Sequence, residues 1–151
     1  MKTIPIIAAA LVACAHPALA AEPTNHAGAE PIVGEATYKA FHEKAGIQRI
    51  MDDFIVRISA DPRIKRRFEF ADLDNLKAQL IDQVCYLIGG PCSYGGKDMT
   101  AAHKAMGVSD ADFNALAEDL QVSMDKEGVP FAAQNKLLAK LAPMERVIVT
   151  D

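Results

Sequence analysis

The sequence has 151 residues, of which 50% are hydrophobic and 24% are charged, and its formal net charge at pH 7 is −4. This amount of apolar material is enough for the core of one globular domain. The mildly acidic balance, 16 basic against 20 acidic residues, gives no electrostatic surface of the kind that nucleic acids require, so we expect no nucleic-acid partner.

The first twenty residues have the features of a secretory signal peptide. A basic start, Met1-Lys2-Thr3, precedes an apolar run too short to cross a membrane, and a small-residue cleavage pattern ends at Ala20. We therefore expect residues 1–20 to be removed on export, which would make the protein periplasmic. One alternative stays open, because Leu11-Val12-Ala13-Cys14 resembles a bacterial lipobox, and a lipid on Cys14 would anchor the chain to a membrane.

The mature chain begins with a predicted flexible leader and two helices. Residues 21–35 mix alanine, glutamate, proline, asparagine and glycine, which is typical of a leader without regular structure. A short helix is predicted from 36 to 45, with Gly46 ending it. A longer helix follows from 47 to 60, because its apolar residues recur at spacings of three and four, and Pro62 stops it.

The second half of the chain also reads as helical. A helix is predicted over 72–88, a short helical piece over 99–106, and a capped helix over 109–128. The last helix follows Pro130 and continues through Pro143 with a kink. Since no stretch shows the alternation of a β-strand, the predicted fold class is all-α.

A glycine-rich loop before residue 99 carries the most informative residues. Four glycines and a proline lie between Gly89 and Gly96, and such a segment cannot continue a helix. The loop presents one imidazole, His103, which suggests a haem pocket, although most lone histidines are merely structural. Cys85 and Cys92 flank the start of the loop, and in an oxidising compartment we expect a disulfide between them. A buried free Cys85 with an exposed Cys92 is the alternative.

Short motifs run through the chain from about residue 41 to 147. In chain order they are Phe54, Ala60-Asp61-Pro62-Arg63-Ile64, Phe68, Leu76-Lys77, Gly89-Gly90-Pro91, Tyr94-Gly95, Met99 four residues before His103, Gly107-Val108, Phe113 and Gly128-Val129-Pro130. With these motifs the chain resembles the group I truncated haemoglobins. That family has a two-over-two helical sandwich, in which glycines allow an extended loop before the histidine that binds the haem iron.

The resemblance implies a truncated globin domain over residues 36–151 that binds haem b, iron protoporphyrin IX. It makes His103 the proximal iron ligand and the metal-binding residue. The implied haem contacts are Phe54, Phe68, Leu76, Gln79, Leu80, Val84, Tyr94, Met99, His103 and Phe113. The implied distal pocket consists of Ile55, Leu76, Gln79, Leu80 and Gln83.

Two distal positions depart from the family pattern. Group I members commonly carry a tyrosine at the place of Ile55 and often a glutamine at the place of Leu80. A hydrogen bond to partly charged dioxygen would contribute about 1.5–3 kcal/mol. Without it, oxygen should leave roughly ten- to a hundredfold faster. Gln79 and Gln83 remain the polar candidates, and Gln79 either folds inward to donate or lies in solvent near the haem propionates.

The resemblance implies a globin that binds O2, CO or NO at the open sixth position of the iron, and it leaves oxygen transport and sensing undecided. The second hypothesis is an enzyme. A nitric oxide dioxygenase would need an electron donor such as a reductase, and a haem peroxidase would need a distal acid–base group that is not evident. The third is a haem-free helical interaction module, which would leave the glycine-rich arm unexplained.

Overall fold

The structure is a computed structural model that describes residues 26–151, so the predicted signal peptide and residues 21–25 of the leader lie outside it. The described part is helical, and its one β-pairing is an isolated bridge between Val108 and Val149. The elements in chain order are α1 (Ala36–Ala40), α2 (Glu43–Ala60), the 3₁₀ turn η1 (Lys65–Phe68), α3 (Leu73–Leu87), α4 (Met99–His103), α5 (Asp110–Glu127), α6 (Phe131–Leu141), the 3₁₀ turn η2 (Ala142–Met144) and α7 (Glu145–Ile148). The predicted all-α class is confirmed.

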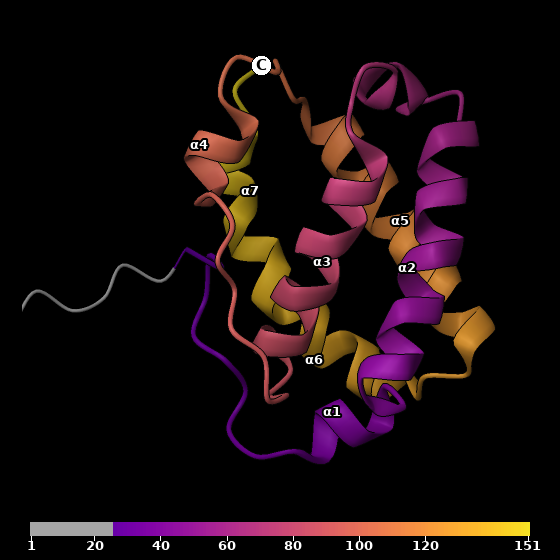
Figure 1. Cartoon of the computed structure of the whole chain (residues 1–151). Coiled ribbons are helices and arrows are strands. Elements are labelled where there is room, and N and C mark those ends of the chain that lie inside the picture. Colours follow the sequence, from indigo (N-terminus) through magenta and orange to yellow (C-terminus); the bar gives the residue numbers. More distant parts are fainter. Residues whose placement is uncertain (1–25) are drawn as a thin grey trace, which may run out of the picture.

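The four long helices form two layers, with α2 and α3 in front of α5 and α6 in Figure 1. The closest packing joins α2 to α5 and to α3. Each helix contributes its apolar stripe to the space between the layers. Fully buried side chains there are Ile47, Ile50, Met51 and Ile58 from α2, Leu87 from α3, Met124 from α5 and Leu137 from α6. Among the described helices, none combines the length and hydrophobicity that a membrane crossing requires.

The break between the first two helices differs from the prediction. It falls at His42 and Glu43, whose φ angles of 56° and 60° are left-handed, and not at Gly46. Gly46 lies buried inside α2, where a Cβ would collide with the carbonyl oxygen of Phe41. This glycine is therefore needed for the close approach of α2 to the preceding turn, and it does not end a helix.

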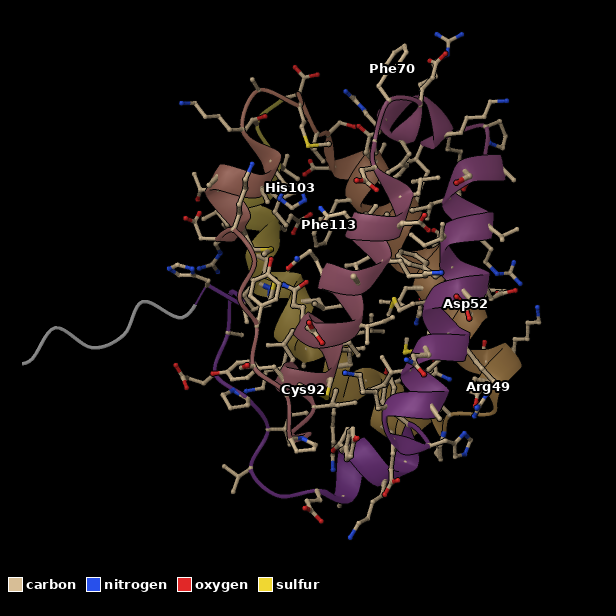
Figure 2. The ribbon with its side chains drawn as sticks, in the orientation of Figure 1. Arg49, Asp52, Phe70, Cys92, His103 and Phe113 are labelled. Carbon is tan, nitrogen blue, oxygen red and sulfur yellow. A yellow bond between two sulfur atoms is a disulfide. The ribbon has the colours of Figure 1, made fainter. Side chains whose placement is uncertain are left out.

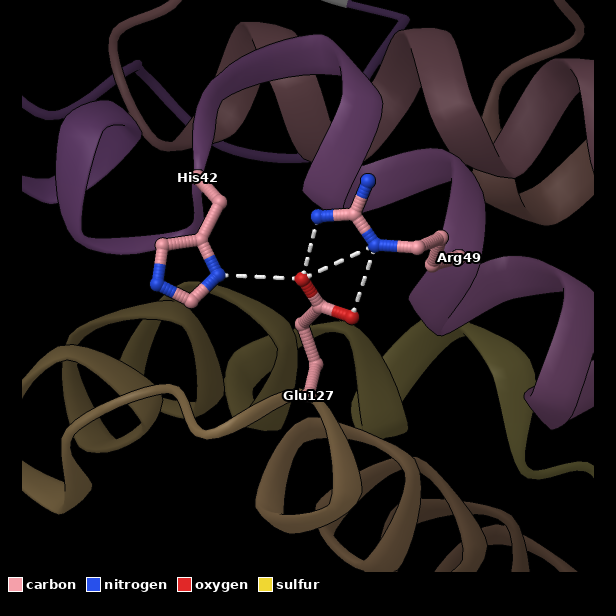
Figure 3. Close-up of polar contacts among 3 residues, drawn as sticks. All are labelled: His42, Arg49 and Glu127. Atoms are coloured by element: carbon pink, nitrogen blue, oxygen red, sulfur yellow. Dashed lines mark hydrogen bonds and ion pairs between the residues drawn. The ribbon is translucent and has the colours of Figure 1, made fainter.

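A polar cluster holds the start of α2 to the end of α5 (Figure 3). The carboxylate of Glu127 accepts hydrogen bonds from Arg49, with a shortest distance of 2.6 Å, and its Oε1 lies 3.0 Å from Nδ1 of His42. The Arg49 hydrogen bonds hold the pKa of Glu127 below its usual value, against the effect of partial burial. The cluster fixes the turn at His42 on the surface of the protein.

Most other helix ends follow the predicted chemistry. Ser109 and Asp112 form a reciprocal capping box at the start of α5, and Gly128, with a φ of +79°, ends that helix. The last helix changes at Leu141 into a 3₁₀ turn that contains Pro143, which is the predicted kink.

The short helix α4 ends earlier than predicted. It stops at His103, because Lys104 is extended and Ala105 has a φ of +61°. Asp98 caps its start by accepting a hydrogen bond of 2.8 Å from the amide of Ala101. His103 is consequently the last residue of a single helical turn.

Residues 26–35, which the sequence predicted to be part of a flexible leader, make defined contacts with the rest of the fold. Ala27 is 1% exposed, and the amide of Ile32 donates a 2.8 Å hydrogen bond to the carbonyl of Leu87. Ala27 and the Ile32 amide thus find partners on the rest of the fold, whereas the side chain of Val33 is exposed.

The expected disulfide between Cys85 and Cys92 is present, with the two Cα atoms 5.8 Å apart. Cys85 is fully buried and Cys92 is half-buried. Gly90 lies between them and Tyr38, where a Cβ would be 2.7 Å from Sγ of Cys85. The disulfide ties the last turn of α3 to the loop that leads to His103.

Candidate functional site

A cavity around His103 separates α3 from α4. It consists of three hollows of about 130, 680 and 330 Å³, and both His103 and Leu80 lie in the wall of each. The smallest, the inner hollow, is walled mainly by apolar side chains of α2, α3 and α5. The largest, the mouth, opens between α3 and the glycine-rich loop, and the third, the rear hollow, extends toward α5, α6 and α7.

The imidazole of His103 is held in one orientation. Figure 2 shows it on the inner side of α4, toward Phe113. Its Nδ1 lies 2.8 Å from the carbonyl oxygen of Met99, one turn earlier. Because a carbonyl oxygen can only accept, Nδ1 carries a proton, and in the neutral imidazole this leaves the lone pair on Nε2. This arrangement is typical of a histidine prepared to bind a metal.

The described residues contain no cluster of side chains that could by itself hold a metal ion. No group of three or more histidine, cysteine, aspartate or glutamate side chains within residues 26–151 could hold a metal ion. A metal at Nε2 of His103 would therefore need most of its ligands from another source, such as a porphyrin.

The structure brings together all ten residues predicted to contact the cofactor. Each lies in the wall of at least one hollow: Phe54, Phe68, Leu76, Gln79, Leu80, Val84, Tyr94, Met99, His103 and Phe113. They come from α2, η1, α3, the glycine-rich loop, α4 and α5. Residues separated by up to 59 positions in the sequence thus surround one space.

Ile55 is not part of this wall. It is half-buried against the core, whereas its α2 neighbours Phe54 and Ile58 line the inner hollow. Met51 and Ile58 lie one turn before and one turn after Ile55 and line the rear and inner hollows, so Ile55 lies at the edge of the same helix face. Its place in the distal pocket stays a prediction from the family resemblance.

The two glutamines of α3 do not point donors into the inner hollow. Nε2 of Gln83 donates to the carbonyl of Ala27 at 2.9 Å and to Sδ of Met99 at 3.4 Å, which uses both amide hydrogens. Gln79 lines only the mouth. Its Oε1 lies against Gly96 of the glycine-rich loop, so close that a Cβ on this glycine would be 2.5 Å away. The distal side is thus poorer in donors than the sequence implied.

An ion pair closes the inner hollow beside His103. Arg67 donates to the carbonyl of Met106 at 2.7 Å and to the carboxylate of Asp112 at 2.8 Å. The backbone amide of Ser109, followed by its hydroxyl and Arg67, holds the pKa of Asp112 below its usual value, against partial burial. Sequence reasoning missed this pair, because its members are 45 residues apart.

Several apolar wall residues were also missed. They are Ile58, Ile64, Met106, Leu116 and Ile148 in the inner hollow, and Leu138, Leu141 and Met144 in the rear hollow. Half of them, namely Ile58, Leu116, Leu138 and Leu141, belong to the apolar stripes that the periodicity revealed. A stripe does not distinguish a side chain in the packed core from one that lines a cavity.

Comparison with known proteins identifies the family. Residues 36–150 match the model of the family described as bacterial-like globin. The chain belongs to the bacterial-like globin family. The group 1 truncated hemoglobin of Tetrahymena pyriformis is 34% identical over 102 residues, which are 65% of this chain and 84% of that protein. The group 1 truncated hemoglobin GlbN of Synechocystis is 33% identical over 97 residues, 59% of this chain and 78% of that protein.

Solved structures agree with this assignment. The Fe(III) form of the Tetrahymena pyriformis truncated hemoglobin has a TM-score of 0.73 at 28% identity, covering 76% of this chain and 98% of that one. The 2/2 hemoglobin of Synechococcus, solved with covalently attached heme, has a TM-score of 0.69 at 23% identity over 75% of this chain and 97% of that one, which shows the shared fold. The predicted group I truncated haemoglobin family and two-over-two fold are confirmed, and the chain is a haem-binding globin.

The cavity of this globin fits a haem. A porphyrin is a broad apolar ring with two carboxylates at one edge, so it needs apolar walls and a polar opening. The inner and rear hollows supply the apolar walls, and the wall of the mouth contains Asn75, Gln79 and Lys97. His103 lies in the wall of all three hollows, and its hydrogen bond to Met99 leaves Nε2 without a partner inside the chain.

Proposed function

We propose that this globin binds diatomic gases at the iron of a haem b whose proximal ligand is Nε2 of His103. One observation carries the proposal: Nδ1 of His103 donates to the carbonyl of Met99, so Nε2 is the free nitrogen of an imidazole that lies in the wall of every hollow. Both cysteines of the described part are in the disulfide, which supports a haem held without bonds to cysteine.

The bound haem supplies an iron with one open position for O2, CO or NO. The protein surrounds that position with apolar groups, since Phe54, Leu76 and Leu80 line the inner hollow. The polar side chains in its wall are His103 and the Arg67–Asp112 pair, in which each charge already has its partner. A gas in this space would receive no hydrogen bond from α2 or α3, so oxygen should dissociate quickly, with CO less affected.

This distal environment favours reversible gas binding over nitric oxide dioxygenation or peroxidase chemistry. A dioxygenase needs oxygen to stay bound until nitric oxide arrives, and it needs a reductase as electron donor. A peroxidase needs an acid–base group beside the substrate. Leu80 and Phe54 can neither donate a hydrogen bond to bound oxygen nor transfer a proton.

We also propose that the globin acts after export. The basic start, short apolar run and cleavage pattern of residues 1–20 support a signal peptide. The disulfide between Cys85 and Cys92 supports an oxidising compartment, since such bonds are rare in the cytosol of most organisms. Whether the chain is soluble in the periplasm or anchored through a lipid on Cys14 is decided by the mass of the mature N-terminal peptide.

Visible spectra of the ferric, ferrous and ferrous–CO forms test the proposed ligation. We expect a sharp Soret band that shifts with CO in the wild-type protein and loss of stoichiometric haem in His103→Ala. In His103→Gly, added imidazole should restore the spectrum by replacing the missing side chain. His42→Ala, which removes a surface histidine remote from the cavity, is the control. An unchanged spectrum in His103→Ala would refute the proposal.

A further inference from the structure

Residues 27–34 form a non-helical segment of turns and bends, here named the strap, that lies against the end of α3. The amide of Ile32 donates to the carbonyl of Leu87 at 2.8 Å. The strap passes so close to Gly89 that a Cβ there would be 2.6 Å from the carbonyl oxygen of Ile32, and Gly89 has a left-handed φ of +83°. The match to the globin family begins at residue 36, after the strap. The strap therefore lies outside the residues that match the family.

The other end of the strap touches side chains that line the cavity. Ala27 is 1% exposed, and its carbonyl accepts the 2.9 Å hydrogen bond from Gln83, which is itself 6% exposed. A Cβ on Gly28 would be 2.8 Å from Sδ of Met144 and 3.1 Å from Cγ of Met99. Gln83, Met99 and Met144 all line the rear hollow. The strap thus supports the outer side of that wall.

One amide group connects three parts of the cavity. Nε2 of Gln83 on α3 reaches the strap at Ala27 and, at 3.4 Å, Sδ of Met99 on α4. Met99 lies in the same helical turn as His103 and accepts the hydrogen bond from its Nδ1. The Gln83 amide therefore links α3 to α4, two of the elements that line the mouth.

We propose that the strap is a haem-retaining wall of this globin and that Gln83 is the positioning residue that latches it. Haem escapes when its cavity opens, and α4 is a single turn of five residues, so its own backbone hydrogen bonds do little to hold it in place. A latch that joins α3, α4 and the strap lowers the frequency of that opening. The inference rests on the proposed function in that it requires a haem bound beside His103.

The test is the rate at which ferric holoprotein, as the full chain, transfers haem to excess apomyoglobin. Gln83→Leu places an apolar side chain of similar size in the wall and removes both hydrogen-bond donors. We expect haem transfer to apomyoglobin to become about three- to tenfold faster. The matched control is Gln134→Leu. Gln134 is also a buried glutamine whose Nε2 makes two hydrogen bonds, to Asp125 and to the carbonyl of Val129, but it lines none of the three hollows. Gln134→Leu should lower the free energy of unfolding without raising the rate of haem transfer to the same extent.

A second variant opens the strap without altering Gln83. Gly28→Val places a side chain against Met144 at a residue whose φ is +90°, so the strap should lift. We expect faster hydrogen exchange at the Ile32 amide and faster haem transfer, with the ferrous–CO spectrum unchanged.

Two results would overturn the proposal. One is that Gln134→Leu speeds haem loss as much as Gln83→Leu does at equal loss of stability. The other is that Ile32 exchanges faster in Gly28→Val while haem transfer keeps its wild-type rate. A wild-type protein that forms no holoprotein with a histidine-ligated spectrum would instead refute the proposed function.

Discussion

The guanidinium of Arg67 lies 2.8 Å from the carboxylate of Asp112, which joins the corner before α3 to the first turn of α5. The same guanidinium donates to the carbonyl of Met106, just beyond α4. Three segments that surround the inner hollow thus meet at one side chain.

We predict that Arg67→Gln lowers the free energy of unfolding by about 1 kcal/mol, because two hydrogen bonds are lost at a partly exposed site. Arg66→Gln is the matched control, since Arg66 is exposed and makes no ion pair in the described part. Urea unfolding at pH 7 measures both. Equal effects of the two substitutions would show that the pairing with Asp112 contributes nothing.

The carboxyl group of Asp119 should destabilise the fold at neutral pH. Burial and the adjacent charge of Asp61 raise the pKa of Asp119, and its buried Oδ2 has no hydrogen-bond partner. An acid with a raised pKa in the folded state loses stability as the pH rises from its unfolded pKa through its folded pKa. Asp119→Asn should therefore stabilise the protein at pH 7, by about 1 kcal/mol if the new amide donates to Asp61, and have little effect near pH 3. Thermal unfolding at the two pH values checks this, and a larger gain at the lower pH would contradict it.

Asp53 should show the opposite dependence on pH. Burial alone would raise its pKa, but hydrogen bonds from Lys126, Arg57 and Ser123 lower it to about 2. An acid with a lowered pKa contributes stability above its unfolded pKa and loses it as the pH falls through the folded value. Asp53→Asn should therefore cost about 1 kcal/mol at pH 7, after allowance for solvent screening, and almost nothing at pH 2. Chemical unfolding across this range gives the difference, and a loss that does not depend on pH would point to packing instead of charge.

Leu80→Gln should slow oxygen dissociation about tenfold. Leu80 lies in the wall of all three hollows, so a side-chain amide there could donate to oxygen bound on the haem. Stopped-flow mixing of the oxygenated protein with an oxygen scavenger measures the rate. Carbon monoxide provides the internal control, because its smaller charge should make its dissociation change much less. Equal slowing of both gases would indicate a narrowed exit and not a hydrogen bond.

Reduction of the disulfide between Cys85 and Cys92 should destabilise the protein by about 2–3 kcal/mol, the range for closing a short loop in the chain-entropy model. Replacing both cysteines by serine should give the same loss, and that variant should no longer respond to dithiothreitol. Urea unfolding with and without the reductant makes the comparison. If dithiothreitol leaves the free energy of unfolding of the wild-type protein unchanged, the prediction is contradicted.

The helices were predictable because their information is local. The spacing of apolar residues gave the long helices, and the Ser109 cap and Gly128 gave the ends of α5. Gly46 was misread, because glycine permits a close approach as well as a helix end, and the sequence does not tell which. The left-handed turn at His42 and Glu43 contains no glycine and so gave no signal.

The candidate site was predictable as a set but not in its polar details. The glycine-rich loop and its lone histidine pointed to His103, and the family resemblance supplied the surrounding wall. The partner of Gln83 is the carbonyl of Ala27, which is 56 residues earlier and in a segment read as a flexible leader. The sequence does not tell whether Ile55, next to Phe54, lies in the wall or beside it, because a shift of one helix position turns a side chain by about 100°.

The brevity of α4 has a consequence for how the protein matures. His103, the proposed haem ligand, is on a single helical turn that packs against α7 and is held by its Asp98 cap, by the bond from His103 to Met99 and by the Gln83 amide. A single turn of helix has little intrinsic stability in water. Cofactor capture and the last local folding step should therefore be the same event, with the segment around α4 becoming ordered as the iron is bound.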